Sequence, residues 1–132
     1  MTGKLADVDL RREERIVVAV LSGEIDMSNA TSVRQEIAEF VTPDDDAVVI
    51  DLSDLSFIDS AGLHSLIELG TALGERRQQL LLAAAMGSHI ERALEIVGMR
   101  SVVQVHPSRD EAIAAARAST VERRPVDPPD HA

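Results

Sequence analysis

Residues 47–63 read AVVIDLSDLSFIDSAGL, and this stretch decides the fold that we predict for the chain. Its first part, residues 47–52, is apolar except for Asp51. Because apolar and polar side chains do not alternate there, we predict a strand that is buried on both faces. A short polar turn follows. A helix then begins with Asp59 as its N-cap, since a carboxylate accepts hydrogen bonds from the first unpaired backbone N–H groups.

The pattern downstream of this N-cap predicts a helix that is mostly buried. Its polar residues His64, Glu68, Thr71 and Glu75 are spaced by three or four, and apolar residues fill much of the rest. Only one narrow stripe of the helix is therefore expected to face water. Ser60 lies in the first turn, where free N–H groups and the positive end of the helix dipole are close to its hydroxyl.

Two strands and a helix are predicted upstream. Residues 6–10 alternate apolar and charged side chains, and residues 16–21 (IVVAVL) form an apolar run. These two segments predict an antiparallel hairpin at one edge of a sheet, with a charged turn at residues 12–15. Residues 23–26 (GEID) are predicted to end the second strand, and apolar residues at helical spacing predict a helix at residues 30–40.

Two further strand–helix units are predicted downstream. Residues 80–85 (LLLAAA) form an apolar run, and Ser88 and Glu91 have the spacing of a capping box that opens a short helix. Gly98 is expected to end that helix, because glycine adopts the left-handed conformation at little cost. A last strand at residues 102–105 and a final helix complete the order β-β-α-β-α-β-α-β-α.

This order predicts a single α/β domain with a mixed sheet of four to five strands, an N-terminal antiparallel hairpin and about four helices. The domain is expected to span residues 1–118. Residues 119–132 form a Pro-rich tail that holds three of the chain's five prolines, and we expect this tail to be disordered. The loops that carry Asp26 and Asp59 both follow strands, so they are expected to share one end of the sheet.

Composition narrows the classes of function. The formal net charge is −10, which makes nucleic acid a poor partner because phosphate contacts depend on Lys and Arg. The longest apolar runs are about six residues, far below the roughly 20 that cross a bilayer, so no membrane association is expected. There is no cysteine and the N-terminus lacks the apolar core of a signal peptide, which is consistent with a cytoplasmic protein.

The spacing of the polar residues does not match that of known enzyme motifs. A hydrolase nucleophile elbow needs glycine two residues before the serine, where this chain has Ile58, and His64 one turn further along does not make a triad. No phosphate-binding glycine loop occurs, and Asp26, Asp54 and Asp59 have no partner that marks them as catalytic. The histidines are scattered without a His-x-x-x-His pair, so we interpret them as surface residues rather than metal ligands: His64, His89, His106 and His131. We therefore expect no enzyme activity, metal or cofactor.

An acyl carrier would also present Asp-Ser at a helix start, but carriers are helical bundles and the apolar runs here are strand-like. What remains is Ser60 as a residue that another protein modifies.

Residues 48–63 (VVIDLSDLSFIDSAGL) closely resemble the signature of the STAS domain of bacterial anti-sigma factor antagonists. In that family a buried strand leads through Asp-Leu-Ser and Phe-Ile/Met-Asp to Ser-x-Gly-Leu at a helix start. Residues 21–26 (LSGEID) are similar to the family's second motif, and the resemblance extends over residues 5–118. Ala61 departs from the Ser or Thr of many members, which removes a possible second phosphoacceptor.

The resemblance implies a protein switch with a STAS fold. The unphosphorylated antagonist would bind a serine-kinase anti-sigma factor and release the sigma factor. The kinase would then phosphorylate Ser60, and a serine phosphatase would reset the cycle. The partner-binding residues implied are Glu24, Asp26, Asp59, Ser60, Ala61 and Gly62.

Two other functions remain open on the same fold: a regulatory subunit of a lipid-transport ATPase, and a module that binds a small molecule or nucleotide.

Overall fold

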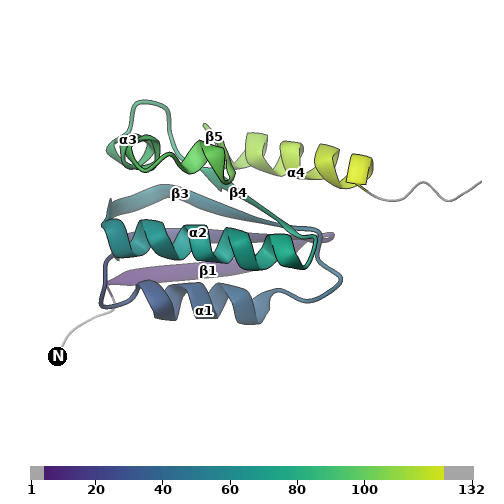
Figure 1. Cartoon of the computed structure of the whole chain (residues 1–132), viewed down its shortest axis with the longest axis horizontal. Helices are drawn as coiled ribbons and strands as arrows, with labels where there is room; N and C mark the ends of the chain where they lie inside the picture. The colour runs from purple at the N-terminus through teal and green to yellow at the C-terminus, as the bar shows by residue number, and fades with distance from the viewer. Residues whose placement is uncertain (1–4, 124–132) are drawn as a thin grey trace, which may run out of the picture.

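The computed structural model describes residues 5–123 and contains one five-stranded sheet flanked by helices (Figure 1). The strands follow one another across the sheet in chain order. The strands are β1 (Ala6–Glu13), β2 (Ile16–Ile25), β3 (Ala47–Ile58), β4 (Gln79–Ala83) and β5 (Gln104–His106). The helices are α1 (Ala30–Phe40), α2 (Ser60–Glu75), α3 (His89–Ile96), the short 3₁₀ helix η1 (Met99–Ser101) and α4 (Arg109–Arg123).

The pairing of the strands confirms the predicted mixed sheet. β1 and β2 form an antiparallel hairpin, and the pairs β2–β3, β3–β4 and β4–β5 are parallel. The described residues contain five strands, the upper end of the predicted four to five, and all four predicted helices. No helix of the described part is long and apolar enough to span a bilayer.

The three central strands bury both faces. Along β3, Val48, Ile50 and Leu52 belong to a core cluster that includes residues of α1, α2 and α3, whereas Ala47 and Val49 belong to a second cluster with α4. Residues 47–52 are all buried, as the lack of alternation predicted. Figure 1 shows α1 and α2 side by side, while α4 lies on the other side of the strands.

β2 and β3 are longer than the sequence predicted, so the expected strand break at residues 23–26 and the polar turn after residue 52 are wrong. The two strands stay paired to Ile25 and Ile58 by absorbing irregularities between Val20 and Ser22 and between Gly23 and Glu24. Gly23 has φ +89°, and a Cβ there would collide with the Leu5 carbonyl oxygen. The polar residues are thus accommodated by bulged pairing rather than by a turn.

Three other segments also end or begin at residues that differ from the predicted ones. β1 continues to Glu13, so the charged turn is shorter than residues 12–15. The last strand is Gln104–His106 rather than residues 102–105. α4 runs to Arg123, past the domain boundary expected at residue 118, and the rest of the expected tail, residues 124–132, lies outside the described residues.

The capping box at Ser88 is present with one change. The Ser88 hydroxyl accepts a hydrogen bond from the Glu91 amide at 3.1 Å, while the Glu91 carboxylate accepts one from Gly87, not Ser88, at 2.6 Å. Gly98 takes the left-handed conformation with φ 70°, as expected.

A buried carboxylate organises the end of the sheet where β3 begins. Arg12 donates to both oxygens of Asp45, at 2.7 and 2.9 Å, and its guanidinium lies 4.6 Å from the centre of the Phe40 ring. The Thr42 amide donates to the same carboxylate at 2.8 Å. Burial raises the pKa of Asp45, but the hydrogen bonds from Arg12 and Thr42 outweigh it and hold the pKa below its ordinary value. This cluster joins β1, α1 and the loop before β3.

Replacing Asp45 with Asn should lower the free energy of unfolding at pH 7 by about 2 kcal/mol, because hydrogen bonds to charged groups contribute roughly 1.5–3 kcal/mol. Since the pKa is depressed in the folded state, this contribution exists above the unfolded-state pKa of about 4 and is lost as pH falls through the folded-state pKa. Urea unfolding of the two proteins should therefore give converging stabilities below about pH 4.

Asp44→Asn is the matched control, because Asp44 is the exposed neighbour and carries the same charge. An equal loss of stability in Asp44→Asn would attribute the effect to the charge of the loop rather than to Arg12.

Candidate functional site

The carboxylate of Asp59 ties the start of α2 to the loop after β2. One of its oxygens accepts a hydrogen bond from the Gly62 amide at 3.0 Å, which caps the helix as predicted. The other accepts one from the Met27 amide at 3.2 Å, and the Asp59 amide donates to the Ile25 carbonyl at 3.1 Å. The two loops expected to share one end of the sheet are therefore directly bonded.

Asp26 organises the first of these loops. Its carboxylate accepts hydrogen bonds from the Ser28 hydroxyl at 2.5 Å and from the Ser28 amide at 2.8 Å, and these bonds lower the pKa of Asp26. Its own amide donates to the Asn29 side chain at 2.9 Å, and the Asn29 amide group donates to the Glu24 carbonyl at 2.9 Å. The loop is thus held in one conformation, with an ionised carboxylate at the surface.

Ser60 is exposed at the first position of α2, where the sequence predicted it. Its hydroxyl has no hydrogen-bond partner within residues 5–123. Glu24 is exposed near the end of β2, and Ala61 is half-buried against the core. Five of the six residues assigned to partner binding therefore have surface at this end of the molecule.

Gly62 is the exception, because it is buried. A Cβ built on it would lie 2.6 Å from Cγ1 of Ile58 and 2.9 Å from Cγ2 of Ile25, both closer than real Cβ contacts. The glycine lets the first turn of α2 pack directly on the ends of β2 and β3. This close approach explains why the position requires glycine, and its predicted part in partner binding stays a prediction.

Two exposed apolar side chains flank the site and were not among the predicted residues. Met27 is 82% exposed and follows Asp26, and Phe57 is 46% exposed and pairs with Glu24 across β2 and β3. The chain has only two aromatic residues, and this rarity could have singled out Phe57 as a candidate in the sequence. Exposed apolar side chains beside a polar centre are typical of a surface that binds protein.

Within residues 5–123, the remaining histidine candidates contact separate partners. His64 lies 3.7 Å from Glu68, the His89 ring contacts the Ser56 carbonyl at 2.6 Å, and the His106 ring contacts Gln104 at 2.9 Å. Asp54 is exposed on β3. No group of three His, Asp or Glu side chains suited to a metal ion occurs within residues 5–123, and His131 lies outside them.

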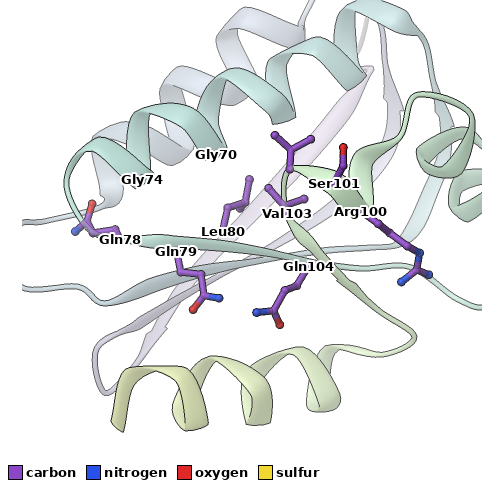
Figure 2. Close-up of a pocket in the computed structure, with 10 residues that line it drawn as sticks. Gly70, Gly74, Gln78, Gln79, Leu80, Arg100, Ser101, Val103 and Gln104 are labelled. Atoms are coloured by element: carbon purple, nitrogen blue, oxygen red, sulfur yellow. The ribbon is translucent and has the colours of Figure 1, made fainter. Parts of the chain in front are cut away.

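A hollow of about 340 Å³ lies at the other end of the sheet (Figure 2). It is lined by residues of α2, η1, β4 and β5, including Gly70, Gln79, Arg100 and Gln104. Figure 2 shows the Gln79 and Gln104 side chains extending from neighbouring strands toward the α4 side. Gln79 pairs with Ala47 at the start of β3, whereas Ser60 follows the end of β3, so the hollow is separate from the predicted site.

Within residues 5–123, a mixed five-stranded sheet leads through β3 to an exposed serine at the start of α2. The chain belongs to the STAS domain family, whose model matches residues 7–112.

Among curated relatives, the anti-sigma-F factor antagonist RsfB of Mycobacterium tuberculosis is 31% identical over 108 residues, which cover 80% of this chain and 87% of RsfB. The crystal structure of an anti-sigma factor antagonist from Mycobacterium paratuberculosis matches with a TM-score of 0.75 at 30% identity, covering 85% of this chain and 94% of that one. The structure of the antagonist SpoIIAA in its unphosphorylated form matches with a TM-score of 0.67 at 21% identity, covering 85% and 97%. The SpoIIAA match establishes the fold alone.

Replacing Gly62 with Ala should destabilise the protein by about 1–3 kcal/mol, as overpacking of a filled core does, although alanine is the better helix former. Gly74 is the matched control in the same helix, because a Cβ there meets nothing within 4 Å. Gly74→Ala should therefore stabilise α2 by up to about 1 kcal/mol. Thermal and urea unfolding of both variants would measure this, and a neutral Gly62→Ala would contradict the assigned packing role.

Proposed function

We propose that this protein is an anti-sigma factor antagonist whose binding to an anti-sigma factor is switched by phosphorylation of Ser60. The observation that carries the proposal is the exposed Ser60 hydroxyl at the start of α2, beside the Asp26 loop and free of hydrogen bonds within the described residues. The names of the relatives at 30–31% identity support the same function.

The local backbone suits a residue that carries phosphate part of the time. Asp59 caps Gly62, while the amides of Ser60 and Ala61 belong to the first turn, where no carbonyl of the helix is in reach. A phosphate adds about −1.5 to −2 charges and three acceptor oxygens, which these amides and the helix dipole tolerate. Phosphorylation is therefore expected to leave the fold intact.

The same phosphate would oppose docking. Met27, in the loop bonded to Asp59, and Phe57, near the end of β3, offer exposed apolar contact, and a partner that covers them and Ser60 must remove water from the site. A dianion at that site has to be desolvated beside the carboxylates of Asp59 and Asp26. An uncompensated charge in an interface costs roughly 2–5 kcal/mol, which changes occupancy of the partner by orders of magnitude.

The partner in this proposal is an anti-sigma factor that is also a serine kinase. It would transfer the γ-phosphoryl group of ATP to the Ser60 oxygen, with loss of the hydroxyl proton and release of ADP. A serine phosphatase would return the hydroxyl by hydrolysis. The protein itself would carry out no catalysis and hold no cofactor, and it would act in the cytoplasm, where sigma factors meet RNA polymerase.

Incubation of the purified protein with each kinase-type anti-sigma factor of its source genome and ATP should add one phosphate to Ser60, detected by mass spectrometry. Ser60→Ala should remain bound to that kinase. Ser60→Asp should bind at least tenfold more weakly in calorimetry, since a tenfold change corresponds to about 1.4 kcal/mol. Equal affinities of the two variants would refute the charge argument. A pull-down that recovers a transport ATPase instead of a sigma regulator would refute the function.

Phe57→Ala and Met27→Ala should each weaken binding to the same kinase by about fivefold or more, because the interface side chains that carry binding energy cost over 1 kcal/mol each when truncated. Val102→Ala is the control, since Val102 is 50% exposed but lines the hollow at the other end of the sheet. Similar losses for all three variants would indicate a general effect on the fold rather than a docking surface around Ser60.

A further inference from the structure

Three side chains form an exposed ridge along α2. Ser60, His64 and Glu68 follow one another at intervals of four residues, so they lie on one face of the helix. The side chains of His64 and Glu68 are 69% and 49% exposed, and Nε2 of His64 lies 3.7 Å from Oε2 of Glu68. The ridge thus begins with the proposed phosphoacceptor and places a histidine one turn away.

The direction of helical side chains brings His64 toward Ser60. Cα–Cβ bonds tilt toward the N-terminus of a helix, so a side chain covers the turn that precedes it. For His64 that turn is the one that starts with Ser60. Residues four apart have Cβ atoms about 5–6 Å apart, a gap that an imidazole ring and a phosphoserine side chain close easily.

The carboxylates of Glu68 and Asp59, on the same helix and at its N-cap, already have other partners. On its own helix His64 faces Glu68, whose other oxygen, Oε1, lies 3.7 Å from Nε of Arg34 on α1. Asp59, at the start of the helix, uses both carboxylate oxygens to accept backbone hydrogen bonds from Gly62 and Met27. Glu68 therefore keeps Arg34 as a partner if His64 turns away.

We propose that His64 is the internal counterion of phosphorylated Ser60, and that its ring moves from Glu68 to the phosphate when the serine is modified. The inference rests on the proposed phosphorylation of Ser60 and adds a residue that acts on the phosphorylated form alone. A phosphate near −2 attracts an imidazolium more strongly than a single carboxylate does.

The contact makes the phosphorylated state sensitive to pH. Phosphoserine loses its second proton near pH 6, and a cation beside the phosphate favours that loss.

The test uses protein with phosphoserine encoded at position 60 during translation, so that no kinase is needed. Phosphorus-31 NMR across pH 5–8 gives the second pKa of the phosphate in the otherwise native chain and in His64→Gln. We expect the phosphate pKa to be lower with His64 present by about 0.3 units, the size that pairs four residues apart on a helix produce. The difference should shrink by at least half in 0.5 M NaCl, because salt screens exposed pairs.

His106→Gln is the matched control, since His106 lies on β5 and contacts Gln104. It should leave the phosphate pKa as it is in the native chain. Equal phosphate pKa values in the native chain and His64→Gln, or an equal shift in His106→Gln, would overturn the proposal. Failure of every kinase to modify Ser60 would instead count against the proposed function, and this measurement would be unaffected by it.

Discussion

The close approach of the first turn of α2 to the ends of β2 and β3 is the constraint on which the rest of the site depends. Gly62 permits it, because any Cβ at that position would meet Ile58 and Ile25. Asp59 fixes it by bonding the helix start on one side and the Met27 amide on the other. Ser60 is consequently held at the surface by a rigid support instead of by a loop, and the Asp26 loop lies beside it at a fixed position.

The two ends of the parallel strands have different roles. Where β3 begins, a buried carboxylate is fully paired: Asp45 is 4% exposed and accepts hydrogen bonds from the Arg12 side chain and the Thr42 amide. Where β3 ends, carboxylates remain at the surface, an apolar pair stays exposed and a hydroxyl has no partner within residues 5–123. The first arrangement stabilises the fold. The second leaves apolar surface and hydrogen-bonding groups available to another molecule, as expected of a docking surface that a modification can control.

The exposed ridge of α2 adds to this surface without any change in the fold. His64 and Glu68 lie on the one stripe of the helix that the core does not use, so their identities are free of packing constraints. In the proposed switch, residues further along the helix would tune phosphorylated Ser60 through charge, while Leu63, Leu66 and Leu69 keep the opposite face in the core.

The sequence by itself determined the order of the elements, the burial of residues 47–52 and the N-cap at Asp59, since each follows from periodicity or local hydrogen bonding within a few residues. It also predicted that the Asp26 and Asp59 loops lie at the same end of the sheet, because parallel strands align their carboxyl ends. The tertiary structure alone decided how far β2 and β3 extend, since bulged pairing between distant segments overrode the local turn signals at residues 23–26 and 53–56. It likewise decided that Gly62 is buried, that Met27 and Phe57 are exposed, and that Asp45 rather than Asp44 pairs with Arg12. Those outcomes depend on which distant side chains come into contact, and a local pattern in the sequence does not contain that information.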